Sequence, residues 1–360
     1  MEVAGIQPLS EMEEISSQVE LSRQNTSFLK PEDLYQTILQ GFARAKRVLI
    51  TSHVRPDGDA VGSLLGLGLA LKETGKDVQM VLDDGTPSAF KNLPGFHSII
   101  RHATGDFDFI IVVDCSDLLR TGHVLEGLGQ PDLNIDHHIT NLNFAKINLV
   151  DPKAVATCAI LAEHLPEIGF NLSTDVASAL LTGLISDTIG FRTSNMTSAA
   201  LHLAANLMDR GANLPGLYQK ALLHRSFNAA RYWGCGLTRL QREKGLVWTS
   251  LTLADRDSAF YPGNDDADLV NVLSTIDDAE VVVIFIEQKE SRVKVSWRSQ
   301  PAYDVSQIAL QFGGGGHPAA SGADVSGDLT TVQNKVLQAT RTLLNNGRVK
   351  NGTKVIDFSK

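Results

Sequence analysis

The chain has 360 residues, 43% of them hydrophobic and 20% charged, which is typical of a globular protein with room for two domains. No stretch is long and apolar enough to cross a bilayer, and the acidic N-terminus does not resemble a secretion signal, so we expect a cytoplasmic protein without a membrane anchor. The formal net charge of −9 argues against binding along long duplex nucleic acid, and the three scattered cysteines favour neither a disulfide framework nor a zinc site.

The N-terminal third begins with a polar segment, residues 1–30, which we expect to be a mobile extension. Apolar residues recur at helical spacing over residues 34–46, and residues 48–51 have the β-branched, apolar content of a buried strand. A second strand is predicted over residues 78–82. A helix is expected between them, beginning at Ala60 and ending near Gly75.

Polar side chains follow the first strand directly. His53, Asp57 and Asp59 come within seven residues, and Pro56 and Gly58 among them favour an open loop before the helix. One imidazole and two carboxylates therefore leave the end of a strand together. Open α/β sheets bind their ligands in crevices of this kind.

Two further apolar runs end in the same way. Residues 109–113 end at Asp114, and residues 133–135 end at Asp136, His137 and His138. Continuous apolar runs separated by helical stretches indicate a mostly parallel, doubly wound sheet that is buried on both faces. The carboxyl ends of parallel strands share one edge, so we expect these side chains to meet.

A fourth carboxylate closes a helix. Residues 173–185 have helical spacing with Ser173 or Thr174 as the N-cap, and Asp187 follows the apolar stretch. A carboxylate at the end of an apolar helix is costly unless a cation binds it.

The second half of the chain has a different pattern. Residues 197–234 suit a helical connector, and a smaller α/β pattern follows it, with strands predicted over residues 247–253, 281–286 and 293–297. Short and long helices are expected over residues 305–312 and 330–344, on either side of a run of glycines. The predicted division of the chain is an extension (1–30), a catalytic domain (31–196), the connector (197–234), a substrate-binding domain (235–345) and a tail (346–360).

The acids and imidazoles of the first domain favour a binuclear metal site. Carboxylate oxygen and imidazole nitrogen without thiolate suit Mn²⁺ or Mg²⁺, and a carboxylate shared by two cations holds them roughly 3.5 to 4 Å apart. Asp114, alone at its strand end, is the natural bridge. Any one of these residues could instead make only loop hydrogen bonds, but their shared placement at strand and helix ends favours the metal site.

The glycine run is a weaker signal. Gly314, Gly315 and Gly316 could leave backbone N–H groups open to an anion, with His317 as a further donor, or could form only a hinge or tight turn. Arg298 ends a predicted strand upstream, where its guanidinium could bind a phosphate or lie solvated on the surface.

These motifs together resemble the DHH phosphoesterase superfamily, which is named for the triplet standing here as Asp136, His137 and His138. The other motifs that resemble the superfamily are the segment from His53 to Ala60, Asp114, Asp187–Thr188 followed by Gly190–Phe191, and the glycines before His317. The glycine motif resembles the DHH-associated domain of the branch that contains RecJ exonuclease and the nanoRNase/pAp phosphatases. The resemblance covers residues from about 35 to 345.

The resemblance implies a set of roles, which we take as expectations. One Mn²⁺ is held by His53, Asp57 and Asp114, and a second by Asp59, Asp114, His137 and Asp187, with Mg²⁺ or Co²⁺ as substitutes. His138 faces the scissile phosphate, and Asp136 orients its neighbours. Arg298, the glycines Gly314, Gly315 and Gly316, and His317 bind another phosphate or a terminal nucleotide.

The implied activity is hydrolysis of very short oligoribonucleotides, and of 3′-phosphoadenosine 5′-phosphate (pAp) to AMP, by water that two metal ions activate. Hydrolysis of c-di-AMP or of linear dinucleotides such as pApA and pGpG is an alternative within the same class, as is a manganese pyrophosphatase, which uses a different second domain. A non-catalytic nucleotide sensor is the alternative from another class. Related proteins are often dimers, so the resemblance also allows a homodimer.

Overall fold

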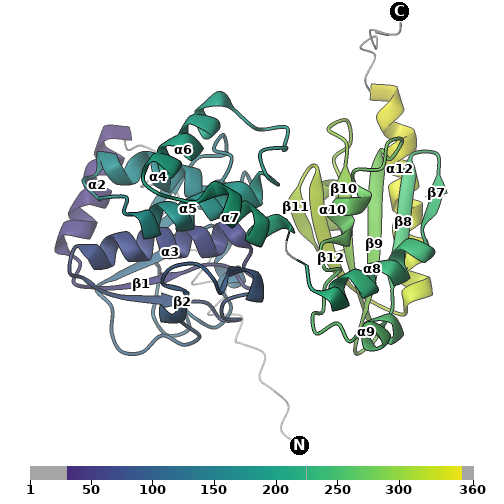
Figure 1. Cartoon of the computed structure of the whole chain (residues 1–360), viewed down its shortest axis with the longest axis horizontal. Coiled ribbons are helices and arrows are strands. Elements are labelled where there is room, and N and C mark those ends of the chain that lie inside the picture. The colour runs from purple at the N-terminus through teal and green to yellow at the C-terminus, as the bar shows by residue number, and fades with distance from the viewer. Residues whose placement is uncertain (1–30, 224, 351–360) are drawn as a thin grey trace, which may run out of the picture. The chain divides into compact units, whose positions relative to one another are not determined.

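The computed structural model describes residues 31–223 and 225–350, so the predicted extension and residues 351–360 lie outside the described part. By its internal contacts the chain divides into two units, Met1–His224 and Arg225–Lys360 (Figure 1). Helices α6 (Ser198–Asp209) and α7 (Leu214–Tyr218) of the predicted connector belong to the first unit, and α8 (Phe227–Thr238) belongs to the second.

The first unit is built on a six-stranded sheet in the order β3-β2-β1-β4-β5-β6, and every neighbouring pair is parallel. The strands are β1 (Arg47–Thr51), β2 (Asp77–Val81), β3 (Ile99–Ile100), β4 (Phe109–Val113), β5 (Leu133–Asp136) and β6 (Ile147–Val150). The predicted α/β class with a parallel sheet is confirmed. The two edge strands β3 and β6 were not predicted, because β3 is only two residues long and β6 is only half-buried.

Helices cover one face of this sheet (Figure 1). They are α2 (Pro31–Arg44), α3 (Gly58–Glu73), α4 (Thr157–Glu167), α5 (Thr174–Asp187) and α6. Val48 and Ile50 of β1 pack in this helical core, whereas Leu49 between them points into a second core on the opposite face. That opposite face is covered by loops and the 3₁₀ turn η3 (Leu118–Thr121), with Val124 and Phe144 as buried contacts.

Helices α3 and α5 approach closely because glycines face each other between them. A Cβ atom on Gly62 of α3 would lie 2.6 Å from the carbonyl oxygen of Ala179 on α5, and one on Gly183 of α5 would lie 2.7 Å from Oδ1 of Asp59 on α3. Without these glycines α5 would have to move outward. The close packing fixes the position of the C-terminal end of α5, where Asp187 lies.

The second unit is a smaller α/β domain, as predicted. Its sheet has the order β11-β12-β10-β9-β8-β7, and all neighbours are antiparallel except the parallel pair of β8 and β9. Its strands are β7 (Gln241–Glu243), β8 (Leu246–Leu251), β9 (Val281–Gln288), β10 (Arg292–Ser299), β11 (Gly315–His317) and β12 (Ala320–Ser326). Strand β8 ends before residue 253, because Thr252 forms a capping box with Asp255 and starts α9 (Leu253–Ala259).

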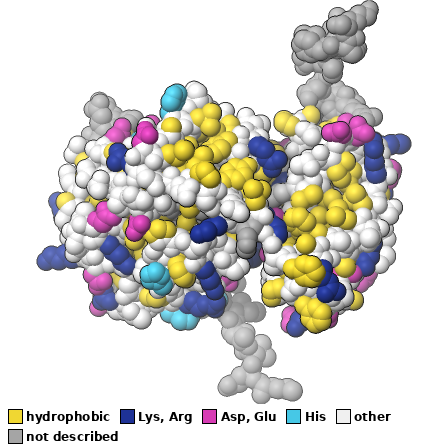
Figure 2. All heavy atoms as spheres, in the orientation of Figure 1, with side chains coloured by type: hydrophobic (Ala, Val, Ile, Leu, Met, Phe, Trp, Pro, Cys, Tyr) yellow, Lys and Arg dark blue, Asp and Glu magenta, His cyan; other side chains and the backbone are white. Residues whose placement is uncertain are grey.

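Helices cover both faces of the second sheet (Figure 1). Trp297 packs on the side of α11 (Ser306–Gln311) and α12 (Leu329–Lys350), and Ile284 packs on the side of α8 and α10 (Leu269–Leu273). Apolar side chains also gather on the visible surface of this unit (Figure 2). Large apolar side chains of this unit with high exposure include Phe227 on α8 and Phe260 after α9. Among the described residues, none of the helices is both long and apolar enough to span a membrane.

Candidate metal centre

The predicted polar residues converge at the carboxyl ends of β1, β4 and β5, which are neighbours in the sheet. His53 follows β1, Asp114 follows β4, and Asp136 ends β5 directly before His137. Helix α3 begins and α5 ends at the same place. The topology therefore brings residues from four separate segments to one point.

Asp57 and Asp59 lie at the start of α3, and this corrects the expected open loop. Asp57 is the N-cap, and its Oδ1 accepts hydrogen bonds from the N–H groups of Asp59 and Ala60, both at 3.0 Å. Gly58 is the first helical residue, and a Cβ atom there would lie 2.3 Å from Oγ of Ser186 on α5. The glycine is thus required for helix packing.

The side chain of Asp59 forms hydrogen bonds to the start of a second helix, α4. Its two carboxylate oxygens accept hydrogen bonds from the N–H groups of Thr157 (2.6 Å) and Cys158 (3.0 Å) at the start of α4. The N-cap of α4 is Ala156, which has no side chain to do this. The carboxylate from α3 therefore caps α4, where the helix dipole stabilises negative charge.

Two histidines present the same ring nitrogen to the centre. Nδ1 of His53 donates to the carbonyl oxygen of Val54 at 2.9 Å, and Nδ1 of His137 donates to that of Ala154 at 3.3 Å. A carbonyl oxygen only accepts, so Nδ1 of each ring carries a proton, and Nε2 is the nitrogen that could bind a metal ion. Both Nε2 atoms face the carboxylates, as those of metal-ligating imidazoles do.

The distances leave room for cations. Nε2 of His137 lies 3.9 Å from Asp59, 3.7 Å from Asp114 and 3.5 Å from Asp187, measured to the nearest carboxylate oxygen. Nε2 of His53 lies 3.7 Å from Oδ2 of Asp114. These separations are too long for good hydrogen bonds. Ligand atoms each about 2.1 Å from one cation are about 3 to 4 Å apart, which matches this spacing.

The buried carboxylates repel one another. Burial, together with the charges of Asp114 and Asp187, raises the pKa of Asp59 well above its usual value, and burial with the charges of Asp57 and Asp114 does the same to the pKa of Asp187. Asp114 behaves in the opposite way. Burial would raise its pKa, but the imidazoles of His53 and the DHH triplet hold the pKa of Asp114 well below its usual range. This excess of negative charge is what divalent cations would neutralise.

The donor set therefore fits two hard cations. Ligand atoms of His53, Asp57 and Asp114 lie within 4.8 Å of one another, and so do those of Asp59, Asp114 and His137. Asp114 belongs to both groups, as a bridging ligand must. The nearby thiols are protonated, since burial raises the pKa of Cys115 to about 12 and that of Cys158 well above its usual value. Oxygen and nitrogen ligands without thiolate suit Mn²⁺, Mg²⁺ or Co²⁺.

Asp136 and His138 form a buried network beside these ligands. Oδ1 of Asp136 accepts from Nδ1 of His138 at 2.7 Å and from the N–H of His137 at 2.9 Å. Burial would lower the pKa of His138, but the bond to Asp136 and the charge of Asp114 raise it to about 9. These interactions favour the protonated ring in the metal-free protein, and Nδ1 lies 3.7 Å from Oδ1 of Asp114.

Three residues that sequence reasoning missed hold the network in place. Asn141 donates to Oδ2 of Asp136 at 2.5 Å and to the side chain of Asn134 at 2.8 Å. The hydroxyl of Thr157 donates to Oδ1 of Asp114 at 2.9 Å. Asn134 could have been found from the sequence, because it is a polar residue inside a predicted buried strand and a buried amide needs hydrogen-bond partners.

The backbone is strained at two points of the centre. Asp114 has φ of 51°, and the turn after Asp187 contains Ile189 at 49° and Phe191 at 66°. Left-handed backbone is rare for residues other than glycine, above all for a β-branched one. The hydroxyl of Thr188 accepts the N–H of Phe191 at 2.9 Å and thereby holds the turn.

The predicted phosphate-binding residues lie in the second unit. Nε of Arg298 donates to the side chain of Asn271 on α10 at 3.1 Å, and its Nη1 donates to the carbonyl of Trp297 at 2.9 Å. Burial lowers the pKa of Arg298 from its usual value, although Asp266 and Asp268 oppose this. Arg298 is thus already held in place by Asn271, which the sequence did not single out.

The glycine run is more ordered than a nest of open amides. The N–H groups of Gly313 and Gly314 donate to the carbonyls of Leu310 (3.1 Å) and Ala309 (2.8 Å), so they end α11. Gly315, Gly316 and His317 form β11, which pairs with β12 at the edge of the sheet. The open amides expected at Gly314 are therefore occupied.

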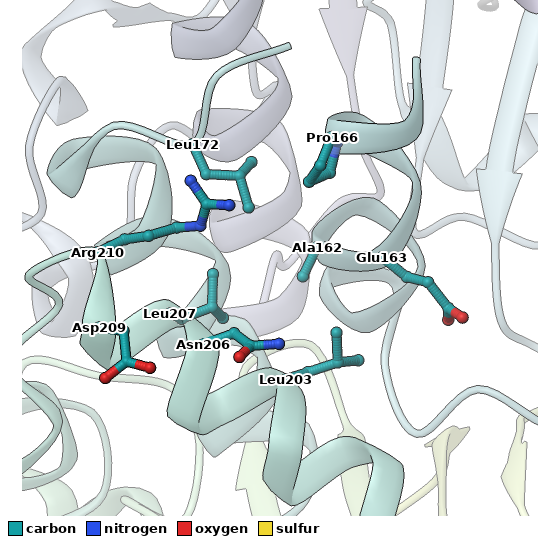
Figure 3. A pocket seen from close by; sticks show the side chains of 9 residues that line it. All are labelled: Ala162, Glu163, Pro166, Leu172, Leu203, Asn206, Leu207, Asp209 and Arg210. Atoms are coloured by element: carbon teal, nitrogen blue, oxygen red, sulfur yellow. The ribbon is translucent and has the colours of Figure 1, made fainter. Parts of the chain in front are cut away.

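A groove of about 480 Å³ lies elsewhere on the first unit, between α4 and α6 (Figure 3). Leu172, Leu203 and Leu207 line it, together with Glu163 and Arg210. Leu172 precedes α5, whereas Asp187 ends it, so the length of this helix, about 20 Å, separates the groove from the metal centre. The groove takes no part in the site.

The chain is similar to known proteins. Residues 47–184 match the DHH family, N-terminal domain, and residues 261–345 match the DHHA1 domain. A bifunctional oligoribonuclease and PAP phosphatase NrnA from Thermus thermophilus is 33% identical over 82% of this chain and 89% of its own length. The protein of the same name from Bacillus subtilis is 26% identical over 83% and 93%, respectively.

A solved structure agrees with these matches. The crystal structure of an exopolyphosphatase-related protein from Bacteroides fragilis has 25% identity and a TM-score of 0.79, and the match covers 88% of this chain and 100% of that one. The fold, the cluster of acids and imidazoles, and the matches agree with one another. The chain belongs to the DHH phosphoesterase family, with a DHH and a DHHA1 domain, and is a hydrolase.

Proposed function

We propose that the protein is a Mn²⁺-dependent phosphoesterase that degrades very short oligoribonucleotides to mononucleotides and converts pAp to AMP. The observation that carries the proposal is that Asp114 belongs to two groups of potential ligand atoms, so that it could be shared by two cations. The names of the relatives from Thermus thermophilus and Bacillus subtilis support the substrate class. Two bound cations would activate water and neutralise charge on the phosphate.

The residues of the chain have separate tasks in this proposal. His53, Asp57 and Asp114 would hold one cation, and Asp59, Asp114, His137 and Asp187 would hold the other. His138 is protonated and donates toward the scissile phosphate or the departing oxygen, since its other nitrogen is bound by Asp136. Asp136 keeps the ring oriented and charged.

The second unit is proposed to bind a further part of the substrate. Arg298 and His317 supply positive charge or hydrogen-bond donors, and the glycine strand β11 with Gly315 and Gly316 lets a phosphate approach the backbone. Because Asn271 already orients Arg298, little side-chain freedom is lost when a phosphate binds.

A product assay tests the proposal. The purified protein in Mn²⁺, Mg²⁺ or Co²⁺ is incubated with pAp, di- and trinucleotides, pApA, pGpG and c-di-AMP, and products are separated by chromatography. AMP from pAp and mononucleotides from short RNA are expected in Mn²⁺, and Asp57→Ala and Asp187→Ala should abolish both. A preference for c-di-AMP or pApA would assign the alternative substrate, and nucleotide binding without any product would assign a sensor.

A further inference from the structure

Two loops beside the metal centre form a rim that none of the roles above uses. The loop after β4 contains the turn η3, and the loop after β5 contains residues 139–142. They are joined, because the N–H of Leu142 donates to the carbonyl oxygen of Ser116 at 2.9 Å. The N–H of Val54, next to His53, donates to the carbonyl oxygen of Arg120 at 2.6 Å, so the rim also adjoins the loop after β1.

The rim presents two arginines. Arg55 lies two residues after His53, and Arg120 lies on η3, and both are exposed. Among the described residues neither guanidinium has a carboxylate or hydrogen-bond partner, whereas Arg47 in the same unit pairs with Asp77 at 3.1 Å. Two such guanidinium groups on the loops beside the metal centre could bind an additional anionic group of a substrate, such as a second phosphate.

The backbone at Arg55 is held in an unusual conformation. Its φ is 56°, and its N–H donates to Oδ2 of Asp84 at 2.5 Å. Left-handed backbone at a non-glycine residue has an energetic cost and concentrates at ligand-binding sites. The hydrogen bond to Asp84 holds the backbone at the point where the side chain of Arg55 leaves the loop.

Two large apolar side chains on the same loops are exposed. Leu119 on η3 is 84% exposed, and Ile139, directly after His138, is 74% exposed. Large aliphatic side chains this exposed, on two hydrogen-bonded loops at the mouth of a site, offer a surface for a flat apolar group. A nucleotide combines such a group, its base, with phosphates.

We infer that this rim is a nucleotide-binding surface of the first unit itself, with Arg55 and Arg120 binding the non-scissile phosphate and Leu119 and Ile139 packing against the base. The inference rests on the proposed function and adds specificity-determining residues to it. pAp carries two phosphates, and the metal centre takes one. We assign the other to the rim, whose backbone is hydrogen-bonded directly after His53, and the second unit is then left to bind the additional nucleotides of longer substrates.

Charge removal tests the phosphate contact. In Arg55→Gln/Arg120→Gln the side-chain lengths and backbone preferences are nearly kept, and the control is Arg44→Gln, which removes an exposed arginine of α2. The double variant should raise the KM for pAp about 10- to 100-fold with kcat changed much less. The contact with the distant phosphate is the same in the ground state and in the transition state, so its loss weakens binding without slowing the chemical step. Binding of Mn²⁺, measured by calorimetry, and the Tm should stay as in the wild type.

The apolar contact has its own test. Leu119→Ser/Ile139→Ser should raise the KM for pAp several-fold but leave that for ribose 3,5-bisphosphate, which has no base, unchanged. If KM for pAp stays within twofold in both double variants, the inference is overturned while the proposed function stands. A changed oligomeric state with unchanged KM would assign Leu119 and Ile139 to a contact between copies. A wild-type protein that hydrolyses neither pAp nor short RNA would overturn the proposed function and this inference with it.

Discussion

Thr157→Val removes one hydroxyl from the edge of the metal centre and changes little else. The hydroxyl donates to Oδ1 of Asp114 at 2.9 Å, and both side chains are almost completely buried. The N–H of residue 157 still donates to Asp59 in the variant, so the cap of α4 is kept. A hydrogen bond to a charged acceptor contributes about 1.5 to 3 kcal/mol, and each 1.4 kcal/mol is about tenfold in affinity. We therefore expect Mn²⁺ to bind about 10- to 100-fold more weakly, which is the usual effect of removing a partner of a metal ligand.

Calorimetric titration with Mn²⁺, after treatment with a chelator, measures this effect, and kcat/KM at limiting Mn²⁺ should fall in parallel. Thr157→Ser keeps the hydroxyl and should restore binding. The matched control is Thr182→Val on α5, which removes a buried hydroxyl that donates to the carbonyl of Ser178 at 2.8 Å. Wild-type Mn²⁺ affinity in a folded Thr157→Val protein would refute the role assigned to this hydroxyl and weaken that of Asp114 as the bridge.

Three further outcomes follow from the same geometry. Gly183→Ala should lower the free energy of unfolding by about 1 to 3 kcal/mol and weaken Mn²⁺ binding, because the new Cβ atom would lie 2.7 Å from Oδ1 of Asp59. Gly234→Ala on α8 is the control, since nothing lies within 4 Å of its Cβ position, and it should raise the free energy of unfolding by about 0.5 to 1 kcal/mol. Chemical denaturation measures both changes. Asp136→Asn should lower the pKa of His138 from about 9, measured by NMR of the metal-free protein; an unchanged pKa would contradict the assigned hydrogen bond. The Tm of the metal-free protein should fall as the pH rises from about 5 to about 9, because the pKa values of Asp59 and His138 are raised and the folded state therefore binds more protons than the unfolded state. Saturating Mn²⁺ should remove this trend. A Tm of the metal-free protein that does not change with pH would contradict the raised pKa values.

The sheet of the first unit was predictable because its signals are local. An apolar run such as residues 109–113 specifies a buried strand, and a polar residue at its end marks the edge where ligands bind. The coincidence of several such ends predicted which residues meet, and the separations around His137 agree with that expectation. The assignment of each residue to a cation stays a prediction.

Contacts between distant segments were not predictable. The capping of α4 by Asp59 joins residues 98 positions apart, and no local pattern records it, since Ala156 at the N-cap gives no signal. Gly58 looked like a loop residue because glycine favours turns, but its role depends on how closely Ser186 approaches. The glycines before His317 also looked open, although half of the run ends α11, because strand pairing and helix ends depend on neighbours in space.

Asp187 is the last residue of α5, at the end of the helix where the carbonyl groups already concentrate negative charge. Folding without a cation therefore forces like charges together, and each bound ion relieves this cost. A ligand present at 1,000 times its Kd adds about 4 kcal/mol to the free energy of unfolding, a large share of the stability of an ordinary domain. In a cell starved of the metal, the empty protein would be the form that unfolds and is degraded first. The amount of intact enzyme, and not only its turnover, would then follow the supply of the ion.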